Sequence, residues 1–193
     1  TLYLNPVGRY DITVHTTPPV RLTDVELNPG KHNIIGIDVP LGVLSLVEGA
    51  SNTFNERQCV MRSNATGEII YVQNFNTKMK YLSGVYDIEI LTLPRIHYED
   101  YELKGGIESK IEIPLSGNLT ISTTDNILYS VFVMRGDKME KVFDSQLNST
   151  SETIQLLPGD YKIISRSNIK KVAASTKEFN LQIKSAKTTT LKI

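Results

Sequence analysis

The sequence predicts an all-β fold made of tandem, small antiparallel β-sandwich repeats of about 75 residues. A Gly-x-Tyr-x-Ile segment occurs three times, beginning at Gly8, Gly84 and Gly159, so that its tyrosines lie 76 and 75 residues apart. A second type of segment, Gly-x-Leu-x-Leu or Gly-x-Leu-x-Ile, begins at Gly42 and again at Gly117, 75 residues later. Between these anchors, short runs in which apolar and polar residues alternate are separated by turn residues, which is the pattern of half-buried strands.

The common register of these anchors sets the predicted boundaries. One repeat spans 42–116 and a second spans 117–193. Residues 1–41 match only the second half of a repeat, which predicts that its first half was cut away or lies in a preceding domain.

Each complete repeat is expected to hold about seven short strands, spaced as in a β-sandwich. The clearest alternating runs are 10–15, 86–90, 119–121, 130–134 and 179–183. An amphipathic sheet must cover its apolar face, and because no amphipathic helix is available, a second sheet is the expected cover. For 168–175 the sequence leaves a helix and a loop equally open.

The Gly-x-Tyr element predicts a structural corner. Glycine permits a positive φ, and a tyrosine two residues later can bury its ring while its hydroxyl binds nearby backbone. We therefore expect Tyr10, Tyr86 and Tyr161 to stabilise the fold rather than to bind a ligand.

The order of motifs resembles a known group of repeats. It runs from the Gly-x-Leu-x-Ile strand to Leu156-Leu157-Pro158-Gly159-Asp160-Tyr161-Lys162-Ile163, and then to Thr188-Thr189-Thr190-Leu191-Lys192-Ile193. This order is similar to PEGA-like and carboxypeptidase-regulatory-like (transthyretin-like) β-sandwich repeats of bacterial envelope proteins. The resemblance implies an immunoglobulin- or transthyretin-like sandwich of the kind found next to von Willebrand factor A domains. It implies a location in the bacterial cell envelope (periplasm or cell surface) or secretion.

Composition excludes several classes of function. The 21 basic and 21 acidic side chains give a net charge of zero, which argues against a nucleic-acid partner. A single cysteine and three histidines argue against a disulfide framework and a cysteine-rich zinc site, so no metal and no cofactor is expected. No apolar run approaches the length of a membrane span, and nothing near Thr1 reads as a signal peptide.

Candidate binding residues fall into two groups, and no catalytic residue is assigned. The aromatic candidates are Tyr98, Tyr101 and Tyr129, because exposed aromatic rings stack on sugars. The basic candidates, for an acidic partner such as an anionic glycan or a lipid headgroup, are Lys162, Arg166, Lys170 and Lys171.

Two further residue patterns have structural interpretations. Residues 97–102 are expected to form a charged edge strand, in which alternation sends Tyr98 and Tyr101 to opposite faces. Cys59 lies in an apolar run and is expected to be buried and unreactive.

These observations favour a non-enzymatic repeat module. It would act as a spacer and protein-interaction scaffold for another protein or for a preceding domain of the same chain. The alternative is a carbohydrate- or peptidoglycan-binding module with a cell-wall glycan as its ligand. A hydrolase would need an acid–base pair, and the sequence offers none that we can place.

Overall fold

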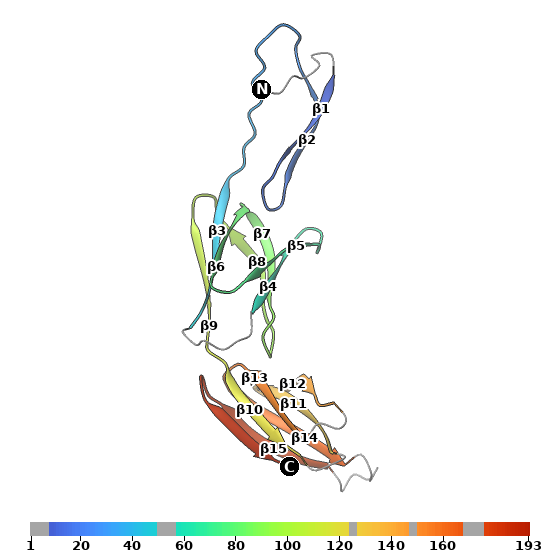
Figure 1. Ribbon diagram of the computed structural model, residues 1–193, viewed down its shortest axis with the longest axis vertical. Helices are drawn as coiled ribbons and strands as arrows, with labels where there is room; N and C mark the ends of the chain where they lie inside the picture. Colours follow the sequence, from blue (N-terminus) through green and yellow to red (C-terminus); the bar gives the residue numbers. More distant parts are fainter. Residues whose placement is uncertain (1–7, 50–56, 124–126, 147–149, 168–175) are drawn as a thin grey trace. The chain divides into compact units, whose positions relative to one another are not determined.

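The computed structural model describes residues 8–49, 57–123, 127–146, 150–167 and 176–193, and every regular element in these ranges is a β-strand (Figure 1). The chain divides into two compact units. The described parts of 1–47, 58–89 and 97–111 form one unit, and those of 48–57, 90–96 and 112–193 form the other. The boundaries between the units divide the predicted repeat 42–116, so the division into domains at 42 and 117 stays a prediction. The segment 168–175 lies outside the described residues.

The first element is a hairpin, dark blue in Figure 1. Strands β1 (Arg9–Val14) and β2 (Val20–Glu26) pair antiparallel, and exposure alternates along β1 as the sequence predicts. The register is interrupted between Tyr10 and Ile12, opposite Asp24, whose φ is 63°. An extra residue on one strand of an antiparallel pair is a β-bulge, which increases the local twist.

The next seven strands form the middle sandwich. They are β3 (Leu41–Glu48), β4 (Gln58–Ser63), β5 (Ile69–Asn74), β6 (Thr77–Leu82), β7 (Gly84–Ile90), β8 (Ile96–Leu103) and β9 (Glu108–Ile113). One sheet has the order β6-β3-β9 and the other has the order β5-β4-β7-β8. Both sheets contribute buried side chains, including Leu44 and Tyr81 from the first and Met61, Ile88 and Leu103 from the second.

The last seven strands form the C-terminal sandwich. They are β10 (Gly117–Ser122), β11 (Ile127–Arg135), β12 (Lys138–Asp144), β13 (Ser151–Leu156), β14 (Gly159–Ser167), β15 (Thr176–Ile183) and β16 (Thr188–Lys192). Its sheets have the orders β13-β10-β16 and β12-β11-β14-β15. One hydrophobic cluster joins them, with Leu119 and Leu156 from the first sheet and Val131, Tyr161 and Ile163 from the second.

The two sandwiches share one strand order, which confirms the predicted class of tandem β-sandwich repeats. The pairing of β10 with β16 departs from the expected antiparallel arrangement, because it is parallel. Alternation along a strand does not depend on the direction of its neighbour, so the sequence pattern could not show this.

The glycine that opens each sandwich is required by a close backbone approach. A Cβ on Gly42 would lie 2.6 Å from the carbonyl oxygen of Lys104, and one on Gly117 would lie 2.4 Å from that of Lys184. The repeated glycine therefore marks the point where another segment crosses the first strand of the sandwich.

The hydrogen bond of the predicted tyrosine corner is confirmed, whereas the positive φ predicted for its glycine is wrong at Gly84. The Tyr86 hydroxyl donates to the carbonyl of Leu82 at 2.6 Å, and the Tyr161 hydroxyl donates to that of Leu157 at 2.7 Å. Both rings are buried, and burial raises the pKa of both hydroxyls. The expected positive φ is absent at Gly84, whereas at Gly159 φ is positive at 159°, close to extended backbone.

At both positions an added Cβ would make only ordinary van der Waals contact with the corner tyrosine, so the space around the ring does not by itself require Gly84 or Gly159. A Cβ at Gly84 would meet the Tyr86 ring at 3.7–3.8 Å, and one at Gly159 would meet the Tyr161 ring at 3.6 Å. The first corner is tighter, since a Cβ at Gly8 would lie 3.2 Å from the ring of Tyr10, which is half-buried.

Candidate interaction surfaces

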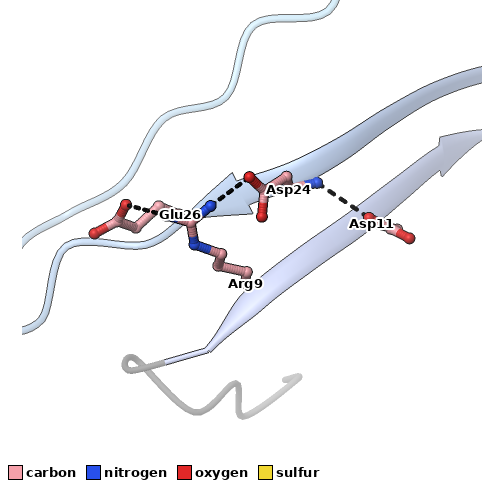
Figure 2. A network of polar contacts seen from close by, with 4 residues as sticks. All are labelled: Arg9, Asp11, Asp24 and Glu26. Carbon is pink, nitrogen blue, oxygen red and sulfur yellow. Dashed lines mark hydrogen bonds and ion pairs between the residues drawn. The ribbon is translucent and has the colours of Figure 1, made fainter.

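A carboxylate holds the bulge in the β1–β2 hairpin (Figure 2). The backbone N–H of Asp24 donates to Asp11 Oδ1 at 3.1 Å, and the Arg9 guanidinium pairs with Asp24 and with Glu26. In the β-ladder no residue lies directly opposite Asp11, because Tyr10 pairs with Val25 and Ile12 pairs with Leu22. The Asp11 carboxylate thus accepts a hydrogen bond from the Asp24 N–H, at the point where the ladder of backbone hydrogen bonds is interrupted.

The middle sandwich repeats this arrangement. The N–H of Asp100, whose φ is 53°, donates to Asp87 Oδ1 at 3.1 Å. The Asn64 amide donates to Asp87 at 3.1 Å and to Asp100 at 2.8 Å. At the equivalent position the C-terminal sandwich has Lys162, which forms an ion pair with Glu178 at 3.0 Å, and β14 pairs with β15 in unbroken register.

The bulge corrects the face predicted for the β8 tyrosines. Tyr98 and Tyr101 were expected on opposite faces, but their rings meet edge to face with centroids 6.0 Å apart. A residue with positive φ at Asp100 breaks the alternation, so the residues after it exchange faces. Both rings are half-buried, and Tyr98 borders a hollow of about 230 Å³ that Arg62, Asp87 and His97 also line.

Tyr129 is a core residue, which corrects its candidacy as an exposed stacking platform. It is 3% exposed, belongs to the hydrophobic cluster of the C-terminal sandwich, and packs against Phe143. Its hydroxyl donates to Glu152 Oε2 at 2.7 Å, and burial, with this hydrogen bond, raises the pKa of Tyr129. Tyr129 alternates with Val131 and Val133 along β11, and all three side chains are buried.

The basic candidates are partly described. The Lys162 side chain is partly exposed and its ammonium is paired with Glu178, whereas Arg166 is exposed near the end of β14. Lys170 and Lys171 lie outside the described residues. A role for these four residues in binding stays a prediction.

Cys59 is fully buried in β4, which confirms the sequence interpretation. Burial raises the pKa of its thiol to about 11. A thiol that stays protonated near neutral pH is a poor nucleophile and a poor metal ligand.

A groove of about 610 Å³ lies among the described residues, and the sequence analysis does not predict it. The turn 16–19 lines one side, and the β4–β5 connection, the start of β5 and the start of β7 line the others. All of these residues belong to one compact unit. Since the lining comes from segments that are far apart in the sequence, no local pattern could reveal it. Its volume is in the range of small-ligand sites.

A backbone hydrogen bond positions the turn beside the groove. The N–H of Leu82 donates to the carbonyl of Thr17 at 2.8 Å, and the Thr16 hydroxyl donates to the Pro18 carbonyl at 2.6 Å. In the other compact unit, the N–H of Leu157 donates to the carbonyl of Leu93 at 2.7 Å. The segments Thr17-Pro18 and Leu93-Pro94 therefore make the same backbone contact, each time with the residue four before a corner tyrosine.

The groove is mostly uncharged. Ile69, Tyr71 and Val85 are exposed apolar side chains on it, and among the described residues that line it only Glu68 is charged. The hydroxyls of Ser63 and Thr66 add hydrogen-bonding groups. Such a surface suits an apolar ligand that carries one positive charge beside Glu68.

Over the described residues, no helix is long and apolar enough to cross a membrane. Within the same ranges, no three side chains of His, Cys, Asp or Glu come together in a group that could hold a metal ion.

The chain is similar to several solved structures of bacterial proteins, two of which are a minor pilin and a pilus adhesin. Over 91% of its length it is similar to the Bacillus anthracis TIE protein, with 13% identity and a TM-score of 0.35. Over 79% it is similar to GBS52, the minor pilin of the Gram-positive pathogen Streptococcus agalactiae, with 12% identity and a TM-score of 0.34. Over 75% it is similar to the pilus adhesin SpaC of Lactobacillus rhamnosus GG, with 9% identity and a TM-score of 0.30.

The lengths covered differ between these structures. The chain spans about a third (36%) of the TIE protein, 94% of the GBS52 structure and 26% of the SpaC structure. No protein-family model and no curated protein matches the sequence. The resemblance to PEGA-like repeats therefore stays a prediction.

Proposed function

We propose that this chain is a non-enzymatic repeat module that serves as a spacer and protein-interaction scaffold in a bacterial cell-envelope or secreted protein. The observation that carries the proposal is that the same strand order and the same turn contact each occur twice in the chain. The strand order of the middle sandwich recurs in the C-terminal sandwich, and the contact between Thr17 and Leu82 recurs between Leu93 and Leu157. A strand order and a turn contact that recur along the chain are typical of repeat modules, and such modules can serve as spacers.

Partner binding is the second part of the proposal. The groove presents exposed Ile69, Tyr71 and Val85, and contiguous exposed apolar surface is typical of interaction sites. The partner is another protein or a preceding domain of the same chain.

Antibodies against the chain, applied to intact and to lysed cells of the source bacterium, test the location. We expect intact cells to be labelled, or the protein to be recovered from the medium. Labelling that appears only after lysis, with none in the medium, would contradict the proposal.

The alternative is a carbohydrate- or peptidoglycan-binding module, and one observation favours it. Tyr71 is 41% exposed in a groove that also carries the hydroxyls of Ser63 and Thr66. Aromatic faces stack on sugar rings, and hydroxyls bind their polar groups. Titration with N-acetylglucosamine oligomers decides between the two functions, because only the alternative predicts saturable binding that Tyr71→Ala abolishes.

A further inference from the structure

The strand β5 differs from every other strand at a described sheet edge. It lies at the end of the order β5-β4-β7-β8 and pairs only with β4 in that sheet. Its sequence, Ile69-Ile70-Tyr71-Val72-Gln73-Asn74, contains no charged residue. The edge strands β1, β2, β6, β8, β9, β12, β13, β15 and β16 each contain at least one.

Charges on edge strands prevent unwanted pairing, because an edge presents a row of unpaired N–H and C=O groups. The matched strand of the C-terminal sandwich, β12, follows this rule with Lys138, Glu140, Lys141 and Asp144. Its counterpart β5 lacks this protection and exposes apolar side chains instead: Ile69 is 56%, Tyr71 41% and Val72 40% exposed.

The free edge of β5 is regular enough to receive a strand. Its pairing with β4 is in unbroken register from Tyr71 to Asn74, and the only shift lies near Ile70. A strand added at this edge can therefore form a continuous ladder with these four residues. Apolar side chains of the added strand would then lie beside the exposed apolar side chains of β5.

The groove is continuous with the edge of β5, and its Glu68 carboxylate determines which charge on a bound segment is favourable. Ile69, Ile70 and Tyr71 belong both to β5 and to the lining of the groove, and the exposed Glu68 precedes them. An extended segment that passes along β5 would bring one of its side chains beside this carboxylate. A basic residue there is complementary, and an acidic one is repelled.

We propose that β5 binds an extended segment of a partner protein by strand addition, and that this segment is apolar along Tyr71 and Val72 and basic beside Glu68. The inference rests on the proposed function, since it specifies how that scaffold recognises its protein partner.

A peptide with the sequence of 58–63, carrying Cys59→Ser, is the probe. It reproduces β4, the strand that already pairs with β5, and its Arg62 lies opposite Ile69 in that pairing. The peptide is titrated to millimolar concentration into the isotope-labelled 193-residue chain, and amide shifts are followed by NMR. A control peptide with Val60→Pro lacks one backbone donor and cannot complete the ladder.

We expect saturable shifts at β5 and around Glu68, with little effect at β8 or β12, and loss of these shifts with the control peptide. Val72→Lys and Ile69→Lys should each abolish the shifts, and Glu68→Gln should weaken binding about two- to fivefold. Met139→Lys is the matched control, because Met139 is 49% exposed on β12, and binding should be unchanged.

Four results would overturn the proposal: no shifts on β5 at millimolar peptide, equal shifts in Val72→Lys, shifts centred on β8 or β12, or sedimentation showing that β5 pairs with a second copy of the chain. Wild-type peak dispersion in each variant shows that it is folded, and Tyr71→Lys replaces any variant that fails this check. Failure here leaves the cell-labelling result intact, and failure of cell labelling leaves strand addition intact, so the two proposals are separately testable.

Discussion

The carboxylate of Asp87 accepts a hydrogen bond from the backbone N–H of Asp100 at 3.1 Å, and Asp11 makes the same contact with Asp24 at the same distance. In both pairs the donor residue has a positive φ. Each aspartate thereby stabilises an irregular strand pairing with its side chain.

Asp87→Ala is expected to lower the free energy of unfolding by about 1–2 kcal/mol, because a hydrogen bond to a charged acceptor is lost. Lys162→Ala removes the residue at the equivalent position of the C-terminal sandwich, where the ladder is regular. Since it breaks only an exposed ion pair, it should cost less than about 1 kcal/mol. Urea melts compare the two variants, and an equal cost would mean that Asp87 does not support the bulge.

Tyr81→Phe tests a buried polar contact that the sequence did not indicate. The Tyr81 hydroxyl donates to Gln73 Oε1 at 2.9 Å, and both side chains are fully buried. The Gln73 amide also donates to the Leu44 carbonyl at 3.1 Å. Removing the hydroxyl leaves a buried acceptor without this donor, so we expect a loss of about 1–3 kcal/mol.

The matched control is Tyr71→Phe, which removes a hydroxyl from an exposed ring of the same sandwich. Its effect should stay within about 0.5 kcal/mol. Thermal and denaturant melts of the two variants should differ clearly, and indistinguishable melts would exclude a stabilising role for the Tyr81–Gln73 contact.

Stability should fall at alkaline pH partly because of Cys59. Burial raises the pKa of this thiol from 9.0 to about 11. The unfolded chain therefore releases the thiol proton first as the pH rises. The stabilisation is fully present below pH 9 and is lost as the pH rises to 11. The loss is on the order of 2 kcal/mol.

Buried tyrosines with raised pKa values add to this alkaline loss, so the comparison with Cys59→Ala isolates the thiol. Denaturant melts at pH 9 and pH 11 should show a smaller decrease for Cys59→Ala than for the wild type. The folded wild type should also resist a thiol reagent near neutral pH. Equal alkaline losses, or rapid labelling, would show that the thiol is accessible.

Gly117→Ala should be strongly destabilising. Its Cβ would lie 2.4 Å from the Lys184 carbonyl oxygen and 2.7 Å from Ile183 Cγ2, so backbone has to move. Overpacking of this kind costs about 1–3 kcal/mol or more. Gly36→Ala is the control, because nothing lies within 4 Å of its added Cβ, and it should be nearly neutral. Similar melting of both variants would show that Gly117 is not a crossing point.

Much of the fold could be predicted because the repeat anchors are structural. The register of Gly42 with Gly117 and of Tyr86 with Tyr161 follows from crossing points and buried rings that each sandwich needs. The faces of Tyr98 and Tyr101 could not be predicted, since one residue with positive φ at Asp100 reverses the alternation. A short strand with period-two alternation contains no sign of such a bulge.

The candidate surface was harder to predict. Tyr129 was a candidate because exposed aromatic rings can stack on sugars, yet it is buried in the hydrophobic cluster of the C-terminal sandwich. The groove joins the turn at Thr17 to residues near Ile69 and Val85, and only tertiary structure brings these segments together. The uncharged β5 was readable from the sequence, but its place at a sheet edge was not.

Hydrogen exchange in Tyr86→Ala and Tyr161→Ala tests most directly whether one sandwich design is used twice. Each variant removes a buried ring that binds backbone four residues earlier, so each should lower the protection of its own sandwich by about 3–5 kcal/mol. Tyr161→Phe, which keeps the ring, should cost about 0.5–1.5 kcal/mol. Matched losses over β3–β9 and over β10–β16 are the predicted result. Wild-type protection in either alanine variant would contradict a shared design.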